Sequence, residues 1–263
     1  MEIAVTHSST ACVLLEIGSV RILTDPVLDG GSKPYKLGPA AWVQRYVGSA
    51  IKPESLPPLD AVLLSHFHHL DNLDESGREV ARKSPLVITG PHEKHELDFS
   101  AVGLKPWDKT TISGSGGEQI TVTATPALHG PWWLPETHRV VGFVLEWAGQ
   151  QHGALYISGD TVFFHGIRQI AEKFHIGTAL LHLGAVHFWP PWPPFFRFTF
   201  NGREAARTAK LLGARTIIPI HYERSVWSHF HESVESYRAE FTQAGLTKAV
   251  KWLEHGQRTL IQV

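Results

Sequence analysis

Short apolar runs rich in β-branched residues recur along all 263 residues and alternate with stretches of helical periodicity. Such runs predict buried strands, and their alternation with helices predicts an α/β or α+β fold in which helices cover sheets. No fixed-period repeat, low-complexity tract or linker interrupts the pattern, so we expect a single domain over residues 1–263. The predicted strands are Ile3–Thr6, Ala11–Ile17, Val20–Thr24, Ala61–Leu64, Leu86–Thr89, Ile120–Thr125, Val141–Glu146, Ala154–Ile157, Ala179–Leu183, Thr216–Ile220, Lys248–Trp252 and Thr259–Gln262. The predicted helices are Asn72–Lys83, Gly166–Phe174, Arg203–Leu212 and Ser233–Gly245.

The composition excludes several classes of protein. With 43% hydrophobic and 19% charged residues the chain is able to form a packed core, and a net charge of -1 provides no basic field for nucleic acid. No run reaches the roughly 18 apolar residues of a membrane span. Because Met1-Glu2-Ile3 shows no basic residues followed by an apolar stretch, we expect no signal peptide. Because Cys12 is the sole cysteine, we expect no internal disulfide and a reducing, cytoplasmic location.

Histidine and aspartate gather directly after four of the predicted strands, in a chain that holds 17 histidines. Strand ends on one edge of a sheet meet in space, so four distant segments are able to form one pocket. Imidazole and carboxylate together suit zinc, iron or manganese, and such an ion generates hydroxide from a bound water near neutral pH. The candidate ligands, in chain order, are His66, His68, His69, Asp71, His129, Asp160 and His221.

This ordered set resembles the metallo-β-lactamase superfamily, which has a His-x-His-x-Asp-His loop, a later lone histidine, a Gly-Asp-Thr aspartate and a final histidine after a strand. The resemblance covers essentially the whole chain. Thr24-Asp25-Pro26 and Ile218-Pro219-Ile220-His221 are similar to the branch related to ascorbate-6-phosphate lactonase and, more distantly, to the N-acylphosphatidylethanolamine phospholipase D group. The resemblance implies a four-layer αββα sandwich holding one or two divalent transition ions, with zinc preferred over manganese or iron.

The same resemblance implies a role for each ligand. His66, His129 and either His68 or His69 would hold one metal, Asp71 and His221 would hold the other, and Asp160 would bridge them. The first loop departs from the family pattern because Asn72 stands where the last histidine is expected. The implied reaction is attack by a metal-held hydroxide on a carbonyl or phosphoryl centre, with Asp71 as an acid or base if one metal binds.

Aromatic residues suggest what the substrate looks like. Trp132 follows His129 closely, and His187 and Trp189 belong to a segment rich in proline, tryptophan and phenylalanine. We expect these three residues to line the site of a small-molecule ester, lactone or phosphodiester with an apolar or aromatic portion. Packing, or contact between copies of the chain in a homo-oligomer, is the equal alternative for the aromatic segment.

Other interpretations compete with a hydrolase. Asn72 favours a degenerate metal-binding relative without activity, and a histidine and aspartate site also suits a non-haem iron redox enzyme. Asp71 has the alternative role of helix N-cap. Asp25 is interpreted as a residue that supports a ligand or forms a turn, in preference to a ligand itself, and His7 as a structural or pocket-lining residue. Residues 228–231 repeat the Ser-His-Phe-His sequence of residues 65–68, which we interpret as a coincidence or as part of the rim.

Overall fold

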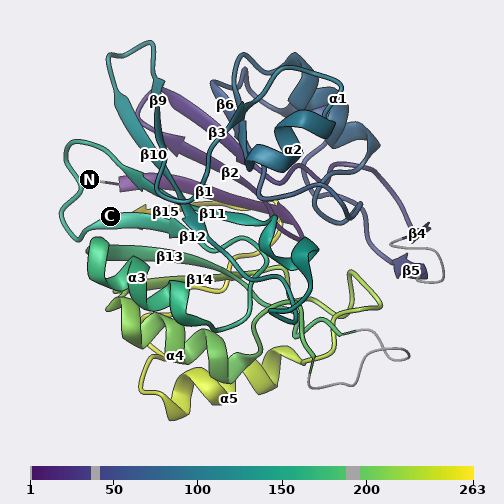
Figure 1. Cartoon of the computed structure of the whole chain (residues 1–263), viewed down its shortest axis with the longest axis vertical. Coiled ribbons are helices and arrows are strands. Elements are labelled where there is room, and N and C mark those ends of the chain that lie inside the picture. The colour runs from purple at the N-terminus through teal and green to yellow at the C-terminus, as the bar shows by residue number, and fades with distance from the viewer. Residues whose placement is uncertain (1, 37–41, 188–195) are drawn as a thin grey trace.

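Two large β-sheets face each other in a computed structural model that describes residues 2–36, 42–187 and 196–263 (Figure 1). The first sheet has seven strands in the order β15-β1-β2-β3-β6-β7-β8, and the second has six in the order β14-β13-β12-β11-β10-β9. A separate hairpin pairs β4 with β5. The strands are β1 (Glu2–Ser9), β2 (Cys12–Ile17), β3 (Val20–Thr24), β4 (Lys33–Lys36), β5 (Trp42–Arg45), β6 (Ala61–Leu63), β7 (Val87–Thr89), β8 (Val102–Gly103), β9 (Lys109–Ser113), β10 (Gln119–Pro126), β11 (Val141–Glu146), β12 (Ala154–Ile157), β13 (Ile176–His182), β14 (Thr216–Ile220) and β15 (Arg258–Gln262).

Helices cover the outer faces of both sheets. Figure 1 shows α3, α4 and α5 stacked against the second sheet and α1 and α2 beside β6 of the first. The helices are α1 (Glu75–Lys83), α2 (Pro91–Glu96), α3 (His165–Lys173), α4 (Gly202–Leu212) and α5 (Val234–Gln243), with short 3-10 turns at Pro53–Ser55 and Pro135–His138. The layers confirm the predicted mixed α/β sandwich. None of the helices within the described ranges is long and apolar enough to cross a membrane.

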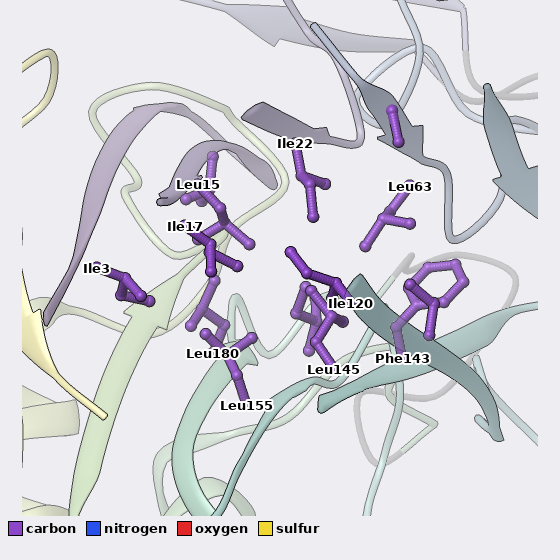
Figure 2. Packing of buried hydrophobic residues seen from close by; sticks show 14 of the residues in the cluster. Ile3, Leu15, Ile17, Ile22, Leu63, Ile120, Phe143, Leu145, Leu155 and Leu180 are labelled. Atoms are coloured by element: carbon purple, nitrogen blue, oxygen red, sulfur yellow. The ribbon is translucent and has the colours of Figure 1, made fainter. Parts of the chain in front are cut away.

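The main hydrophobic core lies between the two sheets, where aliphatic side chains from both inner faces interdigitate (Figure 2). Ile22 and Leu63 come from the first sheet, and Ile120, Phe143 and Leu180 come from the second. All five are buried. Burial of this apolar surface contributes about 25 cal/mol per Å² to the free energy of folding and holds the two sheets together. The strand ends of both sheets are thereby kept along a common edge.

Strand direction places the polar segments at one edge. β12, β13 and β14 pair in parallel, so the segments that follow Ile157 and Ile220 leave the second sheet on the same side. β6 pairs in parallel with β3 in the first sheet, and the loop after β6 contacts the second sheet, because Val141 N donates to Ser65 O at 3.2 Å. The geometry expected from strand ends is therefore present.

One predicted strand is wrong, and one predicted helix begins later than expected. Lys248–Trp252 forms only an isolated bridge between Ile217 and Val250 instead of a strand. The helix predicted from Asn72 begins at Glu75, because the side chain of Asp74 caps it by accepting from Gly77 N at 2.8 Å. A buried ion pair also holds the Asp74 side chain in place at the start of the helix, since its carboxylate lies 3.2 Å from the guanidinium of Arg45.

Candidate metal centre

Three histidines from two loops meet at the strand ends. One ring nitrogen each of His66, His69 and His129 lies within 4.8 Å of the others. His66 and His69 lie in the loop after β6, and His129 follows β10. His66 is fully buried and His129 nearly so. Imidazoles gathered in this way are the donor set of a transition-metal site.

Backbone carbonyls fix the tautomers of two ligand candidates. Nδ1 of His129 donates to the Phe198 carbonyl at 2.8 Å, and Nδ1 of His221 donates to the Leu183 carbonyl at 3.2 Å. In the neutral form of each ring Nε2 therefore carries the lone pair. In the described ranges both Nε2 atoms are buried and make no hydrogen bond, so each is able to act as a metal ligand.

His66 is oriented by a hydrogen-bond relay. Asp25 Oδ1 accepts from Ser65 N at 2.7 Å and from Ser65 Oγ at 2.9 Å. Because the serine hydroxyl donates to Asp25, it accepts from Nδ1 of His66 at 3.0 Å. Nε2 of His66 is then the lone-pair atom. Sequence reasoning named Asp25 as a supporting residue, which this contact confirms, but it missed Ser65, which shows no signal beyond its place before His66.

Two carboxylates complete the cluster. Asp160 Oδ2 lies 3.8 Å from His66 Nε2 and 3.6 Å from His221 Nε2. Asp71 Oδ2 lies 3.6 Å from His221 Nε2. Atoms bound to one ion at about 2.0–2.2 Å each are separated by roughly 3–4 Å, which matches these distances. The other carboxylate oxygen of each aspartate is buried without a hydrogen-bond partner in the part of the chain described.

The electrostatics of the cluster suit a cation. Burial, followed by repulsion from His69, lowers the pKa of His129 to about 3, and burial lowers the pKa of His66 well below its ordinary value. Both imidazoles are therefore neutral at neutral pH. Burial raises the pKa of Asp160 to about 7 against the attraction of His221. A carboxyl group in this position gains from a divalent ion, which would stabilise its ionised form.

Backbone strain concentrates at the same residues. His221 has a φ of 58°, a region that residues other than glycine rarely adopt. The hydrogen bond from His221 N to Thr10 O, 2.8 Å long, holds it there. Gly159 precedes Asp160 at a φ of 61°, and a Cβ atom at this position would lie 2.7 Å from Val141 O. Strain of this kind is typical of functional sites.

The first loop distinguishes between the adjacent histidines His68 and His69. His69 joins the ring cluster, whereas Nε2 of His68 lies 3.1 Å from Oε1 of Glu93, a buried acid on α2. Asp71 faces His221 and is not the N-cap of α1, so its alternative capping role is wrong. Asn72 is fully buried, and within the described residues neither polar atom of its side chain has a hydrogen-bond partner.

The repeated Ser-His-Phe-His segment contacts the candidate site through His229, so its interpretation as a coincidence is wrong, and the alternative that it belongs to the rim stays a prediction. Nε2 of His229 donates to Asp71 Oδ2 at 2.8 Å, although the two residues are 158 positions apart. Burial raises the pKa of Asp71, but the nearby His221 ring and the hydrogen bond from His229 outweigh it and lower the pKa well below its usual value. The verbatim repeat was the available signal, and the absence of a strand before it concealed the role of His229.

The residues predicted to contact substrate lie in different surroundings. Trp132 is 71% exposed and its ring packs edge-on against Trp133, whose ring in turn contacts Phe196. His187 stacks on His231 with ring centroids 3.7 Å apart. Trp189 lies outside the described residues. The substrate role of these three residues stays a prediction.

Comparison with known proteins agrees with this geometry. A profile of the beta-lactamase superfamily domain matches residues 20–222, and the chain belongs to that superfamily. A metal-dependent hydrolase of Methanoregula boonei is 32% identical over 220 residues, covering 81% of this chain and 78% of the relative. Another, of Methanosphaerula palustris, is 28% identical over 241 residues, covering 89% and 88%. The chain is a metal-dependent hydrolase of this group.

A solved structure shows the same fold. The isothiocyanate hydrolase from Delia radicum gut bacteria superimposes with a TM-score of 0.79 at 22% identity, covering 97% of this chain and 98% of that one. At this identity the likeness supports the fold alone. The narrower likeness to the ascorbate-6-phosphate lactonase branch stays a prediction.

Proposed function

We propose that this chain hydrolyses a small ester, lactone or phosphodiester with an apolar or aromatic portion, using zinc held at the strand-end cluster. The observation that carries the proposal is the convergence of buried, unpartnered donor atoms. Nε2 of His66, His129 and His221 and Oδ1 of Asp160 have no hydrogen-bond partner among the described residues. A buried polar atom without a hydrogen-bond partner destabilises the folded state. An ion bound by these atoms would remove that cost.

The assignment of ligands follows from the contacts. His66, His69 and His129 would hold one ion, Asp71 and His221 a second, and Asp160, which lies near both His66 and His221, would be shared. When bound, zinc supplies a Lewis acid that polarises the scissile group and lowers the pKa of water. Zinc is the preferred ion because imidazole and carboxylate are its ordinary ligands; manganese and iron accept the same set.

The chain itself contributes orientation and proton handling. The carbonyls of Phe198 and Leu183 hold the rings of His129 and His221 in one tautomer, so no rearrangement is required before reaction. Asp71 is kept ionised by its hydrogen bond from His229 and by the nearby His221 ring. If a single ion binds at the histidines, this carboxylate is available to position the attacking water by accepting a hydrogen bond from it.

The preference for an aromatic substrate rests on the exposed tryptophans near His129. Trp132 and Trp133 are 71% and 47% exposed, and the ring of His129 lies against that of Phe198. Exposed aromatic surface beside a polar centre favours a ligand with an apolar ring. A bare sugar phosphate would leave this surface in water.

The test compares the wild-type chain with Asp160→Ala, purified without a histidine tag. Elemental mass spectrometry should show a loss of about one or two zinc ions per chain, and hydrolysis of 1-naphthyl acetate should fall to background. The circular dichroism spectrum should be unchanged, since Asp160→Ala removes a buried carboxyl group of which one oxygen has no hydrogen-bond partner among the described residues. Equal zinc in the two proteins would contradict the assignment, and absence of zinc from both after metal is added back would favour a binding protein without activity.

A further inference from the structure

A second cluster of potential ligands lies outside the centre described above. His7, Glu223 and His255 each offer one donor atom, and these atoms lie within 4.8 Å of one another. His7 belongs to β1, Glu223 follows β14 by three residues, and His255 lies in the turn before β15. Sequence reasoning treated His7 as a structural or pocket-lining residue and did not name the other two.

Hydrogen bonding leaves the relevant atom of His7 available. Its Nε2 donates to the Thr10 carbonyl at 2.9 Å, so Nδ1 carries the lone pair. His7 is fully buried, and its Nδ1 makes no hydrogen bond within the described ranges. A backbone carbonyl that fixes the tautomer of a buried imidazole is the usual support of a metal-binding histidine.

The other two residues present donor atoms to the same space. Nε2 of His255 lies 2.8 Å from Oε1 of Glu223, and the ring of His255 meets the ring of His7 edge-on with centroids 4.5 Å apart. Oε2 of Glu223 is buried and makes no hydrogen bond in the portion of the chain described. Nδ1 of His7 and Oε2 of Glu223 therefore lack partners there, and His255 presents Nε2 to the same carboxylate.

The backbone holds this arrangement in place, and one side of it is accessible. Gly256 N donates to the His7 carbonyl at 2.8 Å, which ties the turn of His255 to β1. His255 also lines an open surface pocket together with Ser49 and Ala50. An ion therefore has a route to the cluster that does not pass through the strand-end centre.

We propose that His7, Glu223 and His255 form a separate metal site that binds a divalent first-row transition ion, with zinc as the best fit. Two imidazoles and one carboxylate are a ligand set of zinc sites with an open coordination position. Such an ion would join β1, the segment after β14 and the turn before β15. It would also fix the position of Tyr222 and Glu223, which follow His221. The proposal does not depend on the function assigned to His221.

The test uses His255→Ala, which alters the most exposed of the three ligands, and His175→Ala as its matched control. His175 is an exposed histidine between α3 and β13 that belongs to neither cluster. Full-length proteins are equilibrated with zinc, desalted and analysed by elemental mass spectrometry. We expect His255→Ala to hold about one zinc ion per chain less than His175→Ala, and zinc to raise the thermal midpoint less in His255→Ala.

A second pair of variants separates this site from the catalytic proposal. In an Asp160→Ala, His129→Ala background, which disables the strand-end cluster, about one zinc ion per chain should remain, and adding His255→Ala should remove it. If that background does not fold, the comparison in the otherwise unchanged chain still decides. Equal zinc content in His255→Ala and His175→Ala would overturn the proposal and leave the cluster as an ion pair between Glu223 and His255.

Discussion

Replacement of His229 by alanine removes the hydrogen bond that holds Asp71 at the metal centre. The bond is 2.8 Å long and both side chains are buried. Asn72 stands where the resemblance expects a further histidine, so the carboxylate of Asp71 relies on His229 and His221. We therefore expect His229 to act as a positioning residue for Asp71.

The size of the effect follows from the type of bond. A hydrogen bond to a buried charged group contributes about 1.5–3 kcal/mol. If the loss falls on the ion held by Asp71 and His221, its dissociation constant rises roughly 10- to 100-fold, which is also the range for lost support of a metal ligand. The ion at His66, His69 and His129 should keep its affinity within about threefold, because those rings have other supports.

The assay is a zinc titration against a chromophoric chelator, which resolves ions of different affinity. His231→Ala is the matched control, since this exposed histidine lies in the same repeated segment and stacks on His187. Asn72→His in the His229→Ala background supplies a second test. An imidazole beside Asp71 should recover about tenfold of the lost affinity if His229 compensates for the missing histidine.

Two results would refute this reasoning. Identical zinc affinities in His229→Ala and His231→Ala would show that the hydrogen bond to Asp71 does not support an ion. A uniform loss at every site, accompanied by a lower thermal midpoint, would show that His229 acts on the packing of the segment and not on Asp71.

Three further variants test other parts of the molecule. Burial raises the pKa of Glu93 from 4.5 to about 7, so the stability of the wild-type protein falls as the pH rises between these values. In urea denaturation, Glu93→Gln should therefore stabilise the protein at pH 8 more than at pH 5, by about 1–3 kcal/mol. A difference that does not depend on pH would contradict this prediction. Phe143→Ala should lower the free energy of unfolding by about 3–5 kcal/mol, since this side chain is 1% exposed in the core between the sheets; a loss below about 1 kcal/mol would mean that the site collapses or is less well packed. Trp132→Ala should raise KM for 1-naphthyl acetate about tenfold while leaving KM for ethyl acetate unchanged, and equal effects on both esters would exclude an aromatic contact.

Local patterns were sufficient for four strands, two of which, Ala154–Ile157 and Thr216–Ile220, precede the ligand candidates Asp160 and His221. Val20–Thr24, Val141–Glu146, Ala154–Ile157 and Thr216–Ile220 were predicted with the bounds that the structure has. Their signal is an uninterrupted apolar run, which is a property of neighbouring residues. Short or polar elements such as β4, β9 and α2 were missed, because their side chains are largely exposed and form no continuous apolar pattern.

Sequence by itself determined which segments meet at the site, because parallel strands end on one edge and the polar residues follow them directly. The choice of His69 over His68, the contact of His229 with Asp71 and the cluster around His7 required the tertiary structure. Each depends on the direction of a side chain and on partners from distant parts of the chain, which no local propensity encodes. Packing of the two sheets decides those directions, since it sets how far each loop extends over the edge.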